Sequence, residues 1–119
     1  MKSLKSALCA SVFLVCGWNQ PALSAVEWIR GVTVIETLRR SDGIYGNCMI
    51  KSNKNATINC AAEWFTASCS GDFGSKAAGA QKFDLAVAAL VTGKTIKFQA
   101  NDSKKHNGFC FIDDLRLEG

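Results

Sequence analysis

The sequence predicts a β-rich α+β domain, a five-stranded OB-fold-like barrel with one helix and two disulfides. Strand-type segments surround a single alanine-rich helical segment in the order β-β-β-α-β-β, which is the element order of an OB-fold. The domain is preceded by a segment with the form of a cleaved secretion signal. Removing that signal leaves four cysteines, an even number that is typical of a disulfide framework in a short exported chain.

The first 25 residues have the three parts of a secretion signal, and we expect cleavage after Ala25. Lys2 and Lys5 supply the positive start, and an apolar run from 7 to 15 follows. This run is too short to span a bilayer. The alternatives are cleavage at an earlier small residue or lipid attachment at a cysteine, namely after Ala22, after Ser24 or at Cys16. We therefore expect a secreted or periplasmic protein whose single domain comprises residues 26–119.

Charge and hydropathy narrow the classes of partner. The whole chain has a net charge of +4, and loss of Lys2 and Lys5 leaves 12 basic and 10 acidic residues, a net charge of +2. A nucleic-acid partner usually requires a stronger basic patch, so none is expected. The mature form contains no apolar stretch of about 20 residues, so no transmembrane segment is expected either.

The first half of the domain predicts three strands. Residues 26–38 are rich in β-branched side chains, which favours a strand, and Gly31 within them indicates a bulge. Residues 44–50 form the second predicted strand. The polar residues 51–55 predict a hairpin loop, and residues 56–70 predict a third, longer strand.

A helix is predicted from residue 76 to residue 91. Apolar residues recur there at helical spacing, and dense alanine favours the helix and permits close packing on a sheet. Ser75 is the predicted N-cap and Gly93 the predicted C-terminal stop.

Two further strands complete the prediction. Residues 95–100 alternate cleanly between apolar and polar, and residues 109–117 form the last strand. Asp113 and Asp114 interrupt the alternation of this last strand and indicate a bulge. Residues 101–108 predict a polar loop. A different α+β roll is the alternative fold, because element order does not fix strand pairing.

Four cysteines allow three pairings. A turn centred in the 51–55 loop places Cys48 opposite Cys60, since the two lie equally far from its centre. The expected disulfides are therefore Cys48–Cys60 and Cys69–Cys110. The cysteines form no C-x2-C pair and the chain has one histidine, so no metal site is expected.

Catalytic signals are sparse, and we expect neither an enzyme nor a cofactor. The chain lacks the serine-hydrolase elbow, the phosphate-binding loop and the zinc-protease motif. Ser103, His106 and Asp113 offer the residue types of a catalytic triad, but their spacing does not support one. Asp113 and Asp114 are adjacent in a predicted strand, so their side chains face opposite ways and cannot act as a glycosidase pair.

The densest polar cluster joins the last two predicted strands. In an OB-fold the loop at this place flanks the ligand-binding face, and its polar groups suit hydroxyl-rich ligands such as glycans. The candidate ligand-binding residues are Asn101, Asp102, Ser103, Lys104, Lys105, His106 and Asn107. An ordinary soluble hairpin loop is the alternative. The candidate aromatic platforms, each of which a small core could also use, are Trp28, Tyr45, Trp64 and Phe65.

The expected Cys48–Cys60 bridge, the following helix and the strand sequence Gly93-Lys94-Thr95-Ile96-Lys97 give a recognisable arrangement. It resembles the OB-fold B subunits of bacterial AB5 toxins. The resemblance implies a pentameric ring that binds cell-surface glycans, although no glycan-binding residue of that family can be placed here. The block from 102 to 111 also resembles small exported bacterial proteins, which implies no activity.

The sequence therefore predicts a secreted, non-catalytic binding module that recognises a glycan or another surface ligand as a homo-oligomer. The first alternative is a periplasmic or secreted inhibitor or structural partner of another protein. A small hydrolase is a third.

Overall fold

The computed structural model describes residues 25–119, so the expected secretion signal lies outside the described residues except for Ala25. The elements are β1 (Val26–Val32), β2 (Val34–Arg39), the 3-10 helix η1 (Ile44–Asn47), β3 (Cys48–Ser52), β4 (Trp64–Thr66), α2 (Lys76–Thr92), β5 (Ile96–His106) and β6 (Phe109–Leu117). The predicted β-rich α+β class, with one α-helix and two disulfides, is confirmed for this part of the chain.

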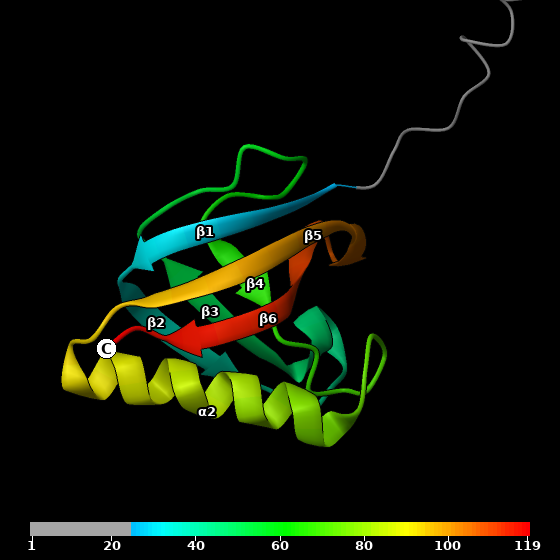
Figure 1. Ribbon diagram of the computed structural model, residues 1–119. Coiled ribbons are helices and arrows are strands. Elements are labelled where there is room, and N and C mark those ends of the chain that lie inside the picture. The colour runs from blue at the N-terminus through cyan, green and yellow to red at the C-terminus, as the bar shows by residue number, and fades with distance from the viewer. Residues whose placement is uncertain (1–24) are drawn as a thin grey trace, which may run out of the picture.

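The strands form one open sheet in the order β1-β5-β6-β4-β3-β2 (Figure 1). Neighbouring strands are antiparallel except β4 and β6, which are parallel. The helix α2 lies along β2, β3 and β6 and covers one side of the sheet (Figure 1). The core combines side chains of the sheet with two alanines of α2, and its largest fully buried members are Ile50, Phe65, Ile96, Phe98 and Ile112. Within residues 25–119, no helix is long and apolar enough to cross a membrane.

The first predicted strand is two strands, so the prediction of five strands was wrong. β1 pairs with β5, whereas β2 pairs with β3, and only Thr33 separates β1 from β2. The expected bulge at Gly31 is confirmed: the β1–β5 register shifts between Ile29 and Val32, and Gly31 has a φ of +62°. Glycine adopts this left-handed conformation at little cost, so the chain can bend there and change partners.

The third predicted strand is much shorter than expected, because the hairpin register was wrong. β4 pairs with β3 from Met49↔Thr66 to Lys51↔Trp64, so residues 53–63 connect the two strands. Side chains organise this connection. Asn55 Oδ1 accepts a hydrogen bond from the Glu63 N–H, and Glu27 Oε1 on β1 accepts from the backbone of Thr57 and Ile58. A tight turn within 51–55 is therefore replaced by a long connection tied to β1.

The same shift in register overturns the predicted disulfides. The bridges are Cys48–Cys69 and Cys60–Cys110. Cys60 lies in the connection rather than opposite Cys48, and it reaches β6 instead. Cys69 follows β4 closely, where the Ala67 N–H donates to the Cys48 carbonyl and brings that segment against β3.

Residues 101–108 are mostly strand rather than loop. β5 continues to His106, and only Asn107 and Gly108 turn the chain into β6. Both turn residues have positive φ, +55° and +87°, as a two-residue type I′ hairpin requires. The extra polar residues are taken up by a bulge between Asn101 and Lys105, where Asn101 Oδ1 accepts from both the N–H and the hydroxyl of Ser103.

The last strand agrees with its prediction, because β6 spans the expected residues 109–117. Gln99 pairs with Asp114 and Ala100 with Ile112, so Asp113 is the extra residue of a bulge. The predicted interruption at Asp113 and Asp114 is thereby confirmed.

The helix agrees closely with its prediction. Ser75 caps its start by accepting from the Ala78 N–H at 3.0 Å, and Gly93 ends it in the left-handed conformation with a bond to Ala89 O. Gly79 on this helix lies tightly against the backbone of residues 67–69. A Cβ on Gly79 would lie 2.7 Å from Ser68 O and 2.9 Å from Ala67 O.

Replacement of Gly79 by Ala should therefore destabilise the protein. Alanine normally favours a helix over glycine by about 1 kcal/mol, but here it meets backbone atoms that cannot rotate away. Overpacking costs about 1–3 kcal/mol, so the Tm measured by circular dichroism should fall. Gly74→Ala is the control, because its Cβ would meet nothing within 4 Å. A Tm for Gly79→Ala at or above that of the parent would contradict the packing described.

Candidate functional site

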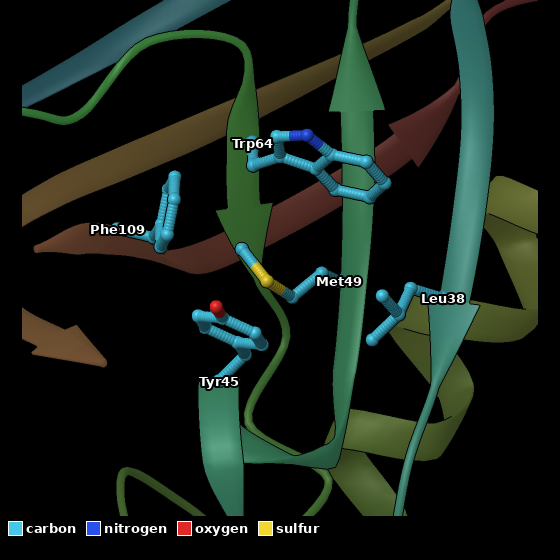
Figure 2. A pocket seen from close by; sticks show the side chains of 5 residues that line it. All are labelled: Leu38, Tyr45, Met49, Trp64 and Phe109. Atoms are coloured by element: carbon cyan, nitrogen blue, oxygen red, sulfur yellow. The ribbon is translucent and has the colours of Figure 1, made fainter. Parts of the chain in front are cut away.

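Five apolar side chains from separate elements line a pocket of about 220 Å³ (Figure 2). They come from β2, η1, β3, β4 and the start of β6, and are Leu38, Tyr45, Met49, Trp64 and Phe109. The pocket therefore depends on the tertiary fold and not on any one segment.

Strand alternation explains why these side chains meet. Ile50 and Phe65 belong to the hydrophobic core, so their neighbours Met49 and Trp64 project from the opposite face of the sheet. Leu38 pairs with Met49 across β2 and β3 and extends the same apolar surface. The pocket thus lies on the face of β2, β3 and β4 that is turned away from the core.

Two aromatic rings form one wall of the pocket, and cations lie near two of its aromatic residues. Tyr45 and Phe109 meet edge to face, with ring centroids 5.6 Å apart. The Arg40 guanidinium lies 5.8 Å from the Tyr45 ring, and Lys51 Nζ lies 6.0 Å from the Trp64 ring. Arg40 is paired with Asp42, and this hydrogen bond lowers the pKa of Asp42 to about 2.

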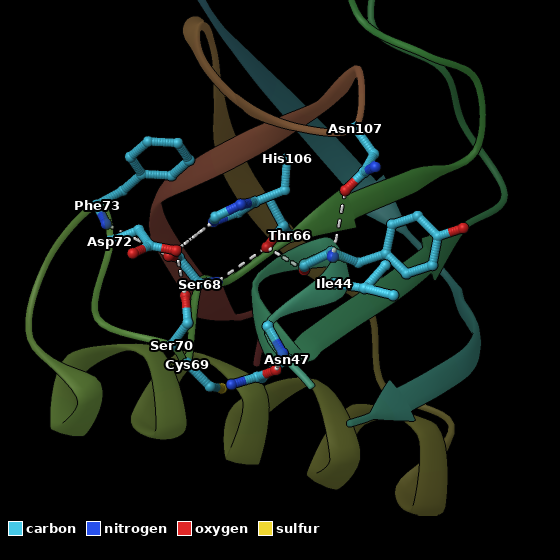
Figure 3. A network of polar contacts seen from close by, with 12 residues as sticks. Ile44, Asn47, Thr66, Ser68, Cys69, Ser70, Asp72, Phe73, His106 and Asn107 are labelled. Carbon is cyan, nitrogen blue, oxygen red and sulfur yellow. Dashed lines mark hydrogen bonds and ion pairs between the residues drawn. The ribbon is translucent and has the colours of Figure 1, made fainter. Parts of the chain in front are cut away.

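A polar network that includes Thr66, Ser68 and His106 lies next to η1 (Figure 3). Ser68 Oγ is 3.1 Å from His106 Nε2, and Asp72 Oδ2 is 3.8 Å from the same nitrogen. Ser68 Oγ also accepts a hydrogen bond from the Phe73 N–H.

The network holds Tyr45 through its backbone. Thr66 Oγ1 donates to Tyr45 O at 2.9 Å, and the Tyr45 N–H donates to Asn107 Oδ1 at 3.4 Å (Figure 3). Gly46 completes this support, because a Cβ there would lie 2.6 Å from both the His106 ring and Thr66 Oγ1. The position of the pocket wall is therefore coupled to His106 and Thr66.

Unfavourable backbone conformations concentrate in the same region. Within residues 25–119, the non-glycine residues with positive φ are Tyr45, Asn47, Glu63, Ser68 and Asn107. Each one lines the pocket, adjoins a pocket residue or belongs to the network of Figure 3. Such conformations cost about 1–3 kcal/mol each and tend to cluster at functional sites.

The Ser68, His106 and Asp72 group does not have the geometry of a catalytic triad. In a triad the acid and the serine bond opposite nitrogens of the imidazole, whereas here both approach Nε2. Ser68 is also only 1% exposed, so a substrate could not reach its hydroxyl. The set considered from the sequence is not assembled either: Ser103 and Asp113 both bond Asn101, not His106.

The residues predicted from the sequence as ligand-binding are dispersed. Asn101 is buried and Asp102 accepts from the Ala25 N–H. Lys104 Nζ lies over Phe111, at 5.7 Å, and Lys105 pairs with Cys110 in the sheet. Ser103 bonds to Asn101, and His106 bonds to Ser68. Asn107 accepts a hydrogen bond from the Tyr45 N–H. Two of the seven adjoin the pocket: Asn107 bonds to Tyr45, and His106 pairs with Phe109 across the β5–β6 turn.

Two of the four predicted platforms, Tyr45 and Trp64, line the pocket. Phe65 is fully buried in the core, and Trp28 on β1 lies beneath the guanidinium groups of Arg30 and Arg116. Sequence reasoning missed the other three lining residues, Leu38, Met49 and Phe109. The sequences of β2 and β3 do not alternate between apolar and polar residues, but the correct register, in which Leu38 pairs with Met49, could have indicated those two.

Residues 25–119 contain no group of three His, Cys, Asp or Glu side chains placed to hold a metal ion. Comparisons of the chain with protein-family models, curated protein sequences and solved structures give no significant match.

The proton affinity of His106 should make stability pH-dependent. Burial lowers its pKa below the ordinary 6.5 and outweighs the opposing charge of Asp72. The unfolded chain therefore binds the proton at higher pH than the folded protein does. The contribution to the free energy of unfolding is complete above about pH 6.5 and is lost as pH falls through the folded pKa. Urea unfolding between pH 7.5 and 5 should show a shallower loss in His106→Gln than in the parent, and equal slopes would contradict this.

Replacement of Gly46 by Ala should destabilise the protein and disturb the pocket. Gly43→Ala is a matched control, because both glycines have positive φ but a Cβ on Gly43 would meet nothing within 4 Å. Left-handed strain of about 1–2 kcal/mol applies to both, and only Gly46→Ala adds a clash with His106. Its fall in Tm should be clearly larger, and near-ultraviolet circular dichroism should report a changed Tyr45 environment. Equal effects of the two substitutions would contradict the proposed coupling.

Proposed function

We propose that this protein is a secreted or periplasmic, non-catalytic binding module that recognises cell-surface glycans through the pocket of Leu38, Tyr45, Met49, Trp64 and Phe109. The observation that carries the proposal is the convergence of three aromatic rings on one accessible pocket. The two disulfides are compatible with export, since such bonds persist in oxidising compartments.

The arrangement of the strands favours an OB-like architecture. If β1 and β2 are taken as one bent strand, the sheet has five strands, and its first strand pairs with β3 at one end and with β5 at the other. OB-folds bind oligosaccharides and oligonucleotides on the face of their second and third strands, between the first-to-second and fourth-to-fifth loops. In this chain those are β3, β4, the residues around Tyr45 and the Asn107 turn, which surround the pocket.

The pocket's size and chemistry favour a sugar ring. Its volume of about 220 Å³ is below the roughly 300–1,000 Å³ of drug-sized sites, so it fits one ring rather than a large ligand. Aromatic rings can cover the C–H face of a sugar, while polar groups at the rim address its hydroxyls. Arg40 lies beside the Tyr45 ring and Lys51 beside the Trp64 ring, and both side chains can serve as hydrogen-bond donors.

A protein ligand is the second candidate. All five lining residues are apolar, so the pocket also suits a bulky apolar side chain from a partner protein. The glycan proposal in its ring-forming version requires contacts between copies of the chain. Exposed apolar residues outside the pocket could supply them, namely Ile35, Leu85, Leu90 and Val91. A discrete oligomer by light scattering would favour the ring, and a monomer that ignores sugars would favour the partner protein.

Removal of Trp64 should abolish or greatly weaken glycan binding. In a glycan-array screen of the oxidised protein followed by calorimetry, Trp64→Ala should raise the Kd of the best ligand by about 10- to 30-fold, as loss of a central aromatic contact does. Trp28→Ala is the matched control, since it removes the same side chain from β1, away from the pocket. Parental binding by Trp64→Ala, at unchanged fold, would disprove the assignment of the pocket.

Lys104→Ala tests the earlier sequence prediction in the same assay. Lys104 contacts Phe111 and not the pocket, so its removal should leave the Kd unchanged. A loss of binding in Lys104→Ala, with binding by Trp64→Ala unaffected, would instead assign the ligand site to residues 101–107.

A further inference from the structure

The start of the domain is held at Ala25, the residue directly before β1. The Ala25 N–H donates to Asp102 Oδ1 at 2.7 Å, and the Asp102 N–H donates to Ala25 O at 3.0 Å. These bonds continue the β1–β5 pairing beyond Val26↔Asn101. A chain that began at Val26 would lose both bonds and leave the Asp102 carboxylate without this partner.

The sequence before Ala25 suits cleavage one residue earlier than predicted above. Secretion signals end in small residues at the first and third positions before the cut. For the Ser24–Ala25 bond these residues are Ser24 and Ala22, both small. For the Ala25–Val26 bond the third position is Leu23, which is large. Sequence and structure therefore favour the same bond independently.

We propose that the Ser24–Ala25 bond is the processing site and that the mature protein begins with an ion pair between the Ala25 ammonium and Asp102. A signal peptidase would hydrolyse the bond with one water molecule, which leaves a carboxylate on Ser24 and a protonated amine on Ala25. The new ammonium then occupies the position of the present N–H, 2.7 Å from Asp102 Oδ1. A hydrogen bond between an ammonium and a carboxylate is stronger than the hydrogen bond from the neutral amide N–H that it replaces.

This inference depends on the expected secretion signal and is independent of the ligand of the aromatic pocket. It also gives Asp102, a residue first considered for ligand binding, a different role. Asp102 would fix the N-terminal end of β1 against β5.

Intact-mass and N-terminal measurement of the exported protein tests the processing site. The full 119-residue chain would be expressed in a bacterium with a general secretory pathway and recovered from the periplasm or medium. The expected product begins at Ala25. A product that begins at Val26 or elsewhere, an uncleaved chain, or a chain lipidated at Cys16 would overturn the proposal.

A double-mutant cycle tests the ion pair. Oxidised chains beginning at Ala25 or at Val26 would each be made with Asp102 and with Asp102→Asn, and their melting followed by circular dichroism. Asp102→Asn should lower the Tm of the Ala25 chain by about 4 °C or more and change that of the Val26 chain much less. Equal changes in the two chains would show that Asp102 acts without the ammonium and would contradict the ion pair.

Discussion

The fold and its pocket depend on the placement of one short strand. β4 has only three residues, and its backbone pairs with β6 at a single parallel position, Thr66↔Phe111. So few ladder bonds cannot hold a strand between two long irregular segments, because ordering each residue costs about 1–2 kcal/mol of entropy. The disulfides supply the constraint from both sides. Cys60–Cys110 ties the chain before β4 to β6, and Cys48–Cys69 ties the chain after it to β3.

The pocket also depends on the position of β4 that the two disulfides fix. β4 carries Trp64 on the pocket face and Phe65 in the core, so the same three residues fix a ligand contact and a central packing contact. Thr66 then donates a hydrogen bond to the backbone carbonyl of Tyr45 and so joins the wall formed by Tyr45 and Phe109 to β4. His106, in contact with Gly46 and Ser68, fills the space behind that wall. Local strain at Tyr45 and its neighbours is sustained because packing, hydrogen bonds and disulfides act on one small region.

Features with local causes were predictable from the sequence. Ser75, the alanine-rich segment and Gly93 define α2 by themselves, and the bulges at Gly31 and Asp113 also agree with their predictions. The errors concern long-range constraints. Glu27 on β1 binds the connection between β3 and β4, a contact that local sequence does not reveal, and the wrong β3–β4 register led directly to the wrong disulfides. The Asn107-Gly108 turn was a local signal that the polar composition of residues 101–108 obscured. The pocket needed the register and the β2–β3 pairing together, so only Tyr45 and Trp64 were among its predicted residues.

The central claim is that the aromatic pocket on the β2–β3–β4 face is the ligand site. Its most direct test is amide chemical-shift mapping of the isotope-labelled, oxidised protein during titration with the best ligand from a glycan screen. The account predicts saturable shifts centred on Tyr45, Met49, Trp64 and Phe109, with smaller changes at Gly46 and Asn107 behind the wall. Shifts confined to other surfaces, or no saturable shift with any glycan in the screen, would contradict it.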